Sequence, residues 1–331
     1  MTANSPFTGK PMRVVYENDI WEFRGEKFPY IHIAFRDDER GEQFTTTESD
    51  TVCYEQVTNQ YRFKYGIPYP DEIIALRNRY GLSAAKMSTI LGFGINQYRL
   101  YELGEVPSES NGKMIRSAMN PRVFLDLVNT SKHHLSDREY QKITTHVKEV
   151  IDQTNLWWDE QRAVDQLFIY GRGKDNGFAP QSTVRLKNLL LYILEKMGDT
   201  FQTKMNKVLF YIDFLSYRER GMAISGLAYN AIEYGPVPHR WNRVYSAFDE
   251  VESQIIMIRE QESVALTACA IADMGCFNKQ EIEIIDTVCA KLKNISAHDI
   301  SELSHDEPAW KNHLHLKSTI PFIDAFSLKA I

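Results

Sequence analysis

The chain has 331 residues, of which 43% are hydrophobic and 25% charged, and its formal net charge is −6. This length favours two or three domains, and these fractions are typical of a globular protein. The sequence contains no uninterrupted run of about 18 apolar residues, and it begins MTANSPFTGK without an apolar leader, so we expect no membrane span and no signal peptide. Its four cysteines form no CxxC pair, which argues against a zinc site and indicates a cytoplasmic protein with reduced thiols.

Residues 1–62 are predicted to form a small β-rich module. Short β-prone runs occur at 13–16, 21–23 and 30–35, and turn-forming residues separate them. A helix is expected to follow, from Ser49 or Asp50 to about residue 60. A module of this size needs another part of the protein to pack against.

Residues 63–131 are predicted to form a domain of five short helices. They are expected at about 70–80, 83–91, 95–103, 110–119 and 121–128. Between positions 61 and 131 there are nine lysines and arginines and six acidic residues, which gives this stretch a net charge of +3. Because the whole chain carries −6, the remaining residues carry −9. A mildly basic module attached to an acidic remainder suits a DNA-binding part joined to a protein-binding part.

The stretch from Gly81 to Gly104 is typical of a helix-turn-helix. Ser83 is a natural N-cap for the first helix, and Gly92-Phe93-Gly94 supplies the turn. Ser88 is small at the point where the second helix crosses the first. In that second helix the residues expected to point inward are Ile95, Tyr98 and Tyr101.

The outer face of the second helix is the face that a recognition helix presents to the major groove. Asparagine and glutamine side chains pair with adenine, and arginine pairs with guanine or phosphate. The predicted DNA contacts are Asn96, Gln97, Arg99 and Leu100 of this helix and Ser83 and Lys86 of the first. The alternative is an ordinary helical hairpin whose outer side chains are only solvated.

Residues 132–180 are predicted to be a helical connector. Ser136 and Glu139 form a capping box for a helix to about residue 153, and residues 154–170, with Trp157-Trp158, are expected to continue it. These helices either join the DNA-binding part to the rest or build a dimer interface. The glycine-rich stretch 171–177 lacks the spacing of a phosphate-binding loop and is expected to be a flexible joint.

Residues 181–331 are predicted to form a second, mainly helical unit that contains a β-hairpin, so the expected fold class is α+β and mainly α. Helices are expected at 183–197, 203–220, 239–250 and 279–292, with capping boxes at 296–299 and 304–307. The hairpin is expected at 224–234, followed by Gly-Pro-Val-Pro, and β-prone runs occur at 254–258 and 264–269.

No catalytic or metal site is predicted. His305, His313 and His315 lack a carboxylate or cysteine spaced to complete a metal site. Nothing in the sequence marks Asp213 and Glu233 as a carboxylate pair, and no common hydrolase, metalloprotease or kinase motif occurs. We therefore expect a binding protein without a cofactor, not an enzyme.

The segment 70–124, above all LGFGINQYRLYELGEVPS, resembles the lambda-repressor-like DNA-binding domain of MqsA-type antitoxins. In that family an asparagine at the start of the recognition helix contacts bases, and Asn96 matches it. An arginine four residues further on also contacts DNA there, whereas this chain has Leu100 at that position and Arg99 before it. The N-terminal module lacks the CxxC pairs of that family's zinc module and is expected to be metal-free.

The segment from about Leu186 to the C-terminus resembles the SocA-like, or Panacea, antitoxin domain. The matching runs are NKVLFYID at 206–213, ISGLAY at 224–229 and YGPVP at 234–238. Together the two resemblances imply an antitoxin that represses its own operon, as a homodimer on operator DNA, and neutralises a separately encoded toxin.

The toxin is expected to contact the exposed parts of aromatic and proline side chains, because aromatic residues dominate interface energetics. These residues are Tyr229, Tyr234, Pro236, Pro238 and Trp241. The alternative is that Gly-Pro-Val-Pro is only a rigid turn. Two other functions stay open: a transcription regulator that senses a ligand or peptide, and a protease adaptor that delivers a toxin for degradation.

Overall fold

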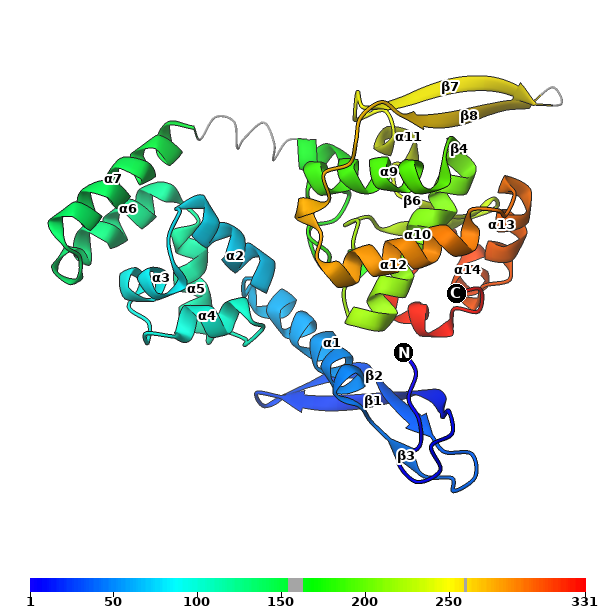
Figure 1. Ribbon diagram of the computed structural model, residues 1–331, viewed down its shortest axis with the longest axis horizontal. Coiled ribbons are helices and arrows are strands. Elements are labelled where there is room, and N and C mark those ends of the chain that lie inside the picture. The colour runs from blue at the N-terminus through cyan, green and yellow to red at the C-terminus, as the bar shows by residue number, and fades with distance from the viewer. Residues whose placement is uncertain (154–162, 259–260) are drawn as a thin grey trace. The chain divides into compact units, whose positions relative to one another are not determined.

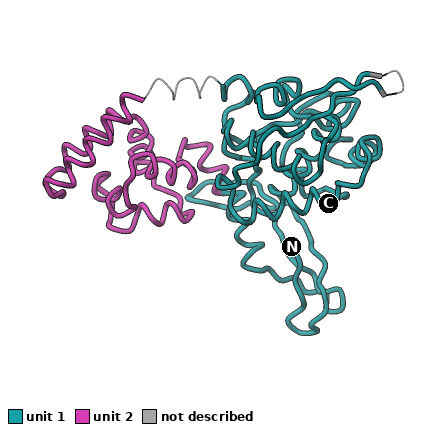
Figure 2. Tube along the Cα trace, turned by 45° about the horizontal axis from the view of Figure 1, so that its top comes forward, with its two compact units in different colours: residues 1–57, 163–331 teal, residues 58–162 magenta. Residues whose placement is uncertain are grey.

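The computed structural model describes residues 1–153, 163–258 and 261–331. The chain divides into two compact units, a larger one of residues 1–57 and 163–331 and a smaller one of residues 58–162 (Figure 2). The fold is α+β with small sheets and a predominance of helix, as predicted. Within the described ranges, no helix combines the length and the apolar character that crossing a bilayer requires.

The N-terminal module is a long antiparallel hairpin of β1 (Arg13–Phe23) and β2 (Glu26–Arg36), with β3 (Gln43–Phe44) added to β2. Arg24 and Gly25 both have positive φ, 53° and 80°, which a tight two-residue hairpin turn requires. The two runs expected at 13–16 and 21–23 are one continuous strand. The intervening polar residues are mostly exposed, so they keep their pairing with β2 without being buried.

Helix α1 (Thr47–Tyr65) is longer than predicted at both ends. Within the larger unit it packs against β2. Its Gln56 side chain accepts a hydrogen bond from the N–H of Ile31 and donates one to the carbonyl of the same residue, each at 3.0 Å. Val52, Cys53 and Val57 are buried beside this contact. This helix is part of the predicted module; the packing partner that the module was expected to need lies in the C-terminal part of the same unit, where the ring of Phe326 packs against Tyr16 with centroids 5.3 Å apart.

The smaller unit contains α2 (Pro70–Arg79), α3 (Ala84–Leu91), α4 (Gln97–Glu102), α5 (Glu109–Ala118) and α6 (Pro121–Thr130), which confirms the five predicted helices. A short turn, η1 (Lys132–His134), follows them. Their apolar faces form one core, in which the rings of Tyr80 and Phe124 stack with centroids 3.8 Å apart. Helix α5 begins earlier than expected because Ser108 is its N-cap, with its hydroxyl accepting the N–H of Asn111.

Helix α7 (Asp137–Asp152) starts at the predicted capping box of Ser136 and Glu139. It is not a free connector, because Ile143, Val147 and Val150 are buried in the core of the smaller unit. The expected helical continuation through Trp157-Trp158 lies, at 154–162, outside the described residues. The predicted connector therefore contributes α7 to the smaller unit, while its residues from 163 onward belong to the larger one.

The C-terminal part of the larger unit is built around α10 (Gln202–Arg220), as Figure 1 shows. Every residue of α10 from 205 to 217 is buried. Packed around it are α9 (Thr183–Met197), α12 (Lys279–Leu292), α13 (Ala297–His305), α14 (Pro308–Leu314) and the short turns η2 (Lys174–Asn176), η3 (Met274–Cys276) and η4 (Phe322–Ser327). A three-stranded sheet has the order β4 (Thr200–Phe201), β8 (Gln261–Ala268), β7 (Val251–Ile258). Helices α9 and α12 have the predicted bounds.

The second β-hairpin lies further along the chain than predicted. Its strands are β5 (Tyr229–Ile232) and β6 (Gly235–Pro238), so Gly-Pro-Val-Pro is a strand and not a segment that follows the hairpin. The helix expected at 239–250 is only the single turn α11 (Trp241–Val244), which Arg240 precedes with a left-handed φ of 54°. The predicted capping box at 304–307 is wrong, because Ser304 lies inside α13.

The glycine-rich stretch 171–177 is a packed turn and not a flexible joint. Asn176 is 1% exposed, and its amide accepts a hydrogen bond from the N–H of Gly173 and donates one to the carbonyl of Gly171. Gly177 has a φ of 58°, and a Cβ there would lie 2.7 Å from the Cβ of Ala223. The side chain of the asparagine and the close approach of the glycine together fix this turn onto the larger unit.

Replacing Gly177 with alanine should lower the thermal unfolding midpoint of the larger unit by roughly 5–10 °C, because a Cβ meets Ala223 and a left-handed φ disfavours a side chain. Gly171→Ala is the matched control, since nothing lies within 4 Å of the Cβ it would add. Calorimetry on both variants provides the measurement. Equal midpoints for the two variants would mean that the turn is not packed as described.

Candidate functional site

The helix pair α3 and α4 forms much as predicted, with one shift. The hydroxyl of Ser83 accepts the N–H of Lys86 as an N-cap, and Gly92 ends α3 with a φ of 72°. Helix α4 begins only at Gln97, with Asn96 as its N-cap residue. Ile95 therefore belongs to the turn and is 76% exposed, so the expectation that it points inward is wrong.

A buried contact fixes the crossing of these two helices. Ser88 is fully buried, and its hydroxyl accepts the backbone N–H of Tyr98 at 3.1 Å. The phenol of Tyr98 in turn donates to the carbonyl of Ile73 in α2 at 2.7 Å. The small residue predicted at the crossing is thus also the group that orients the first turn of α4.

The residues predicted to contact DNA differ in whether their side chains already form hydrogen bonds or ion pairs within the protein. Asn96, Arg99 and Leu100 are exposed, and none of them makes a side-chain hydrogen bond or ion pair with a described residue. Gln97 instead donates to the carboxylate of Glu105 at 2.9 Å. The ammonium of Lys86 is paired with Glu139 of α7, also at 2.9 Å. Ser83 is exposed but already occupied as a cap.

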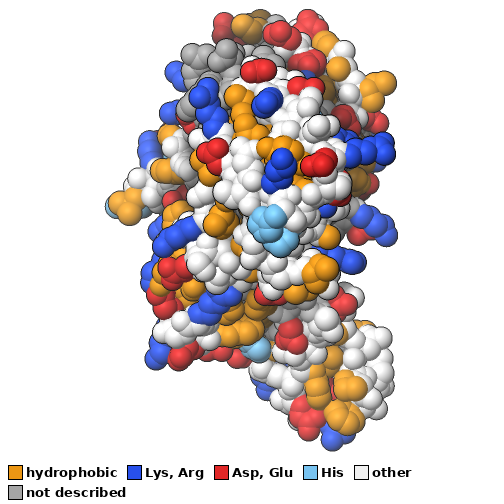
Figure 3. All heavy atoms as spheres, turned by 90° about the vertical axis from the view of Figure 1, so that its left-hand side faces the viewer, with side chains coloured by type: hydrophobic (Ala, Val, Ile, Leu, Met, Phe, Trp, Pro, Cys, Tyr) orange, Lys and Arg blue, Asp and Glu red, His pale blue; other side chains and the backbone are white. Residues whose placement is uncertain are grey.

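Charge on the surface is mixed. Figure 3 views the molecule from the side on which α6 and α7 lie in Figure 1, and basic and acidic side chains are interspersed over that face. This face is therefore not a uniformly basic surface of the kind that binds nucleic acid through phosphates alone.

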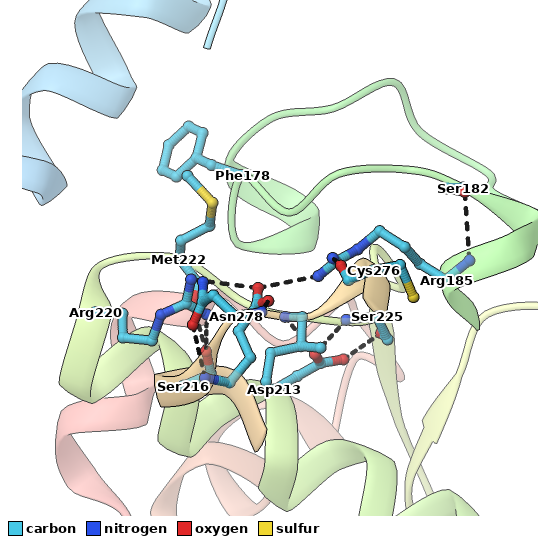
Figure 4. Close-up of polar contacts among 12 residues, drawn as sticks. Phe178, Ser182, Arg185, Asp213, Ser216, Arg220, Met222, Ser225, Cys276 and Asn278 are labelled. Carbon is cyan, nitrogen blue, oxygen red and sulfur yellow. Dashed lines mark hydrogen bonds and ion pairs between the residues drawn. The ribbon is translucent and has the colours of Figure 1, made fainter. Parts of the chain in front are cut away.

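Asp213 organises the segment that follows α10. This carboxylate is fully buried and accepts hydrogen bonds from the N–H groups of Ile224 and Ser225, at 2.9 and 2.8 Å, and from the hydroxyl of Tyr229. The hydroxyl of Ser225 also donates to it (Figure 4). Burial raises the pKa of Asp213, and the hydrogen bonds from Ser225 and Tyr229 act in the opposite direction. Glu233, by contrast, is exposed and paired with Lys317, so the two acidic residues are not a catalytic pair.

Lys207 lies under the turn of the β5–β6 hairpin. It is 1% exposed, and its ammonium donates to the backbone carbonyl of Tyr234. Burial lowers the pKa of Lys207 to about 8. A Cβ on Gly235 would lie 2.8 Å from the Cε of this lysine, so the backbone of the turn rests directly on it.

An ion cluster joins α9, α10 and α12 (Figure 4). Glu281, at the start of α12, pairs with Arg185 at 2.9 Å and with Arg220 at 3.3 Å. Arg220 also donates to the hydroxyl of Ser216 at 3.0 Å. Because Glu281 is only 4% exposed, this cluster holds the scaffold together and offers no open site.

The predicted toxin contacts are not equally accessible. Tyr229 has no exposed surface, and Pro236 and Pro238 are buried, so the expectation of exposed parts on these three residues is wrong. The ring of Tyr229 packs against Phe210 and Phe214 while its hydroxyl binds Asp213. Tyr234 at 73% exposed and Trp241 at 41% remain available to a partner.

The β7–β8 ribbon is an exposed apolar feature that the sequence analysis predicted only as β-prone. Strand β7 is the outer strand of its sheet, and Figure 1 shows the ribbon extending away from the helices. Ile255 is 71% exposed, Ile256 40% and Met257 62%. The sequence signal was a run of apolar residues that does not alternate with polar ones. Exposed apolar edges of this kind are typical of interaction sites.

Two of the three histidines considered as metal ligands, His305 and His313, pack or hydrogen-bond within the fold, and His315 is exposed. His313 binds Asp324 through Nε2 at 2.8 Å and the hydroxyl of Ser318 through Nδ1 at 3.2 Å. The ring of His305 stacks on Trp310 with centroids 4.4 Å apart. Neither arrangement leaves a set of nitrogen atoms facing a common point.

Residues 205–311 match the family model of the antitoxin SocA-like, Panacea domain. This range holds Lys207 and Asp213 of α10, the β5–β6 hairpin and the β7–β8 ribbon. No curated protein and no solved structure matches the chain. The similarity of the C-terminal part to this antitoxin domain is thereby supported, whereas the MqsA-type resemblance of 70–124 stays a prediction.

The buried lysine predicts a pH dependence of stability. The pKa of Lys207 is lower in the folded protein than its ordinary value of 10.5, so between these two values the unfolded chain binds more protons. The contribution of this residue to the free energy of unfolding should therefore rise with pH, by about 2 kcal/mol from pH 7.5 to pH 9.5.

Urea unfolding of the wild type and of Lys207→Met at both pH values measures this rise as the change in the difference between them. Lys291→Met, which removes an exposed ammonium from α12, is the control and should show no such change. A difference between wild type and Lys207→Met that is independent of pH would contradict the burial of a titrating ammonium.

Proposed function

We propose that this chain is the antitoxin of a toxin–antitoxin pair and neutralises its toxin by direct binding. The observation that carries the proposal is the match of residues 205–311 to the SocA-like, Panacea antitoxin domain. The exposed side chains of Tyr234 and Trp241 and the apolar edge of β7 are consistent with a protein partner, because aromatic anchors and unpaired strand edges are common docking features.

The proposed action is binding without catalysis, in the cytoplasm and without a cofactor. Asp213 and Lys207 are buried ionisable side chains, as catalytic residues often are, yet each hydrogen-bonds to backbone or hydroxyl groups of its own domain. In this proposal both side chains hold the segment after α10 and the hairpin turn in place, and neither acts on a substrate.

We further propose that the smaller unit binds operator DNA and represses the antitoxin's own operon. Two copies of the chain would each insert α4 into the major groove of a palindromic site. Two observations support this proposal. Helix α3 is capped by Ser83 and ends at a glycine, and the short helix α4 follows it. The side chains of Asn96 and Arg99 are exposed. Asparagine and arginine at these positions suit contacts with base edges.

Asn96→Ala and Arg99→Ala should each weaken binding to the chain's own promoter by about 1–3 kcal/mol, the usual loss for one base contact. Fluorescence anisotropy with a labelled promoter fragment gives the affinities. Arg122→Ala removes an exposed arginine from α6 and serves as the control. Two variants that bind as tightly as the wild type would exclude α4 as the recognition helix.

Tyr234→Ala and Met257→Asp test the two candidate toxin-binding features separately. At least one of the two variants should weaken toxin binding by tenfold or more and abolish growth rescue. Tyr234→Ala removes an aromatic ring that the toxin would bury, and Met257→Asp places a charge where the toxin would bury an apolar side chain. Rescue is scored in cells that express the neighbouring toxin gene with the full-length chain.

Val184→Asp is the matched control, because it charges an exposed apolar residue of α9 outside the matched range. All three variants should keep the wild-type circular dichroism spectrum and promoter affinity. Full rescue by both Tyr234→Ala and Met257→Asp would place toxin binding on another surface.

A further inference from the structure

Helix α7 carries exposed basic side chains that have no role in the function proposed above. Arg138 and Lys142 are exposed and lie one turn apart, so they share a face of the helix. The buried residues Ile143 and Val147 lie on the side that packs into the core. The basic face of α7 is therefore directed away from the core of the smaller unit.

This face of α7 and the start of α3 together line a cavity of about 770 Å³. Its polar lining residues include Ser83, Lys86, Arg138, Lys142 and His146. His146 holds the two walls in place, because its Nε2 donates to the carbonyl of Arg79, just before the stretch that leads into α3. The positions of the cations are thus set by packing and hydrogen bonding within one compact unit.

One of the two acidic residues at this cavity, Glu139, is engaged by other partners. Glu139 pairs with Lys86 and accepts hydrogen bonds from the N–H and hydroxyl of Ser136, and these contacts, that with Lys86 above all, lower the pKa of Glu139 to about 2. Glu149 lies 3.4 Å from Nδ1 of His146. In the described part of the chain neither Arg138 nor Lys142 forms an ion pair, so two cations at the cavity lack a counter-ion.

Ser83 and Lys86, at the start of α3, line the same cavity. The first N–H groups of a helix have no partner within it, and they favour anions. Ser83 accepts only the N–H of Lys86, which leaves the N–H groups of Ala84 and Ala85 directed out of the helix end. Two unpaired cations beside such a helix end are the chemistry that binds phosphate groups.

We infer that α7 is a second DNA-contacting element, in which Arg138 and Lys142 bind backbone phosphates beside the site contacted by α4. In helix-turn-helix proteins the first helix of the pair crosses the DNA backbone, and here α3 is that helix. The inference rests on the proposed DNA binding. It extends the DNA-binding part beyond the five helices predicted from the sequence to include α7.

The test is the salt dependence of DNA binding by the full-length chain, measured by anisotropy between 50 and 300 mM NaCl, roughly the range in which such slopes are defined. Arg138→Gln/Lys142→Gln should reduce the slope of log K against log salt by about 2, because each lost phosphate contact removes about 0.9. At 0.1 M salt, affinity should fall by about ten- to a hundredfold. The loss should be equal for promoter and unrelated DNA, since phosphates carry no sequence information.

Arg122→Gln/Lys148→Gln is the charge-matched control, because both side chains are exposed in the same unit and neither lines the cavity. An equal loss of slope in this control would overturn the inference, since the effect would then be one of net charge. An unchanged slope in Arg138→Gln/Lys142→Gln, with Asn96→Ala still weakened on the promoter, overturns the role of α7 alone. A wild-type chain that binds no promoter DNA overturns the proposed repression as well.

Discussion

The burial of two ionisable side chains on α10 is the constraint on which the C-terminal part of the larger unit depends. Asp213 is surrounded by donors from the segment 224–229, and Lys207 meets the carbonyl of Tyr234 at the next turn of the chain. A buried ionisable group without partners is strongly unfavourable. If this segment moved away while the rest of the domain stayed packed, Asp213 and Lys207 would lose their hydrogen-bond partners, so the segment is held in position. The exposed ring of Tyr234 is consequently carried on a fixed turn, which lowers the entropy lost when a partner binds.

Much of this unit was predictable because its signals are local. The bounds of α9 follow from a serine cap before it and Gly198 after it, and those of α12 from the asparagine cap before Lys279. The burial of Tyr229 was not predictable, because it depends on Asp213, which is sixteen residues away and on another element. The position of the hairpin was also missed, since two prolines in β6 run against the usual composition of a strand.

The helix pair illustrates the same division between local and distant information. Periodicity predicted the burial of Tyr98 and Tyr101, and the close crossing expected in a helix-turn-helix predicted the small residue at Ser88. It failed for Ile95, because the start of α4 is decided by the hydrogen bond from Tyr98 to Ser88 and not by the apolar pattern. For α7 the capping box predicted a helix, yet it carries no information on which core the apolar side of that helix joins.

Counting charges also cannot locate a DNA-binding surface in the smaller unit. Its basic residues fall into two groups that the sequence does not distinguish. Arg77 is paired with Glu102, Arg116 with Glu72 and Lys86 with Glu139, so these cations mainly connect helices. Arg99, Arg138 and Lys142 have no such partner in the described part of the chain. A phosphate gains most from a cation that has no carboxylate to leave, and the proposed DNA contacts of α4 and α7 are therefore assigned to cations of the second group.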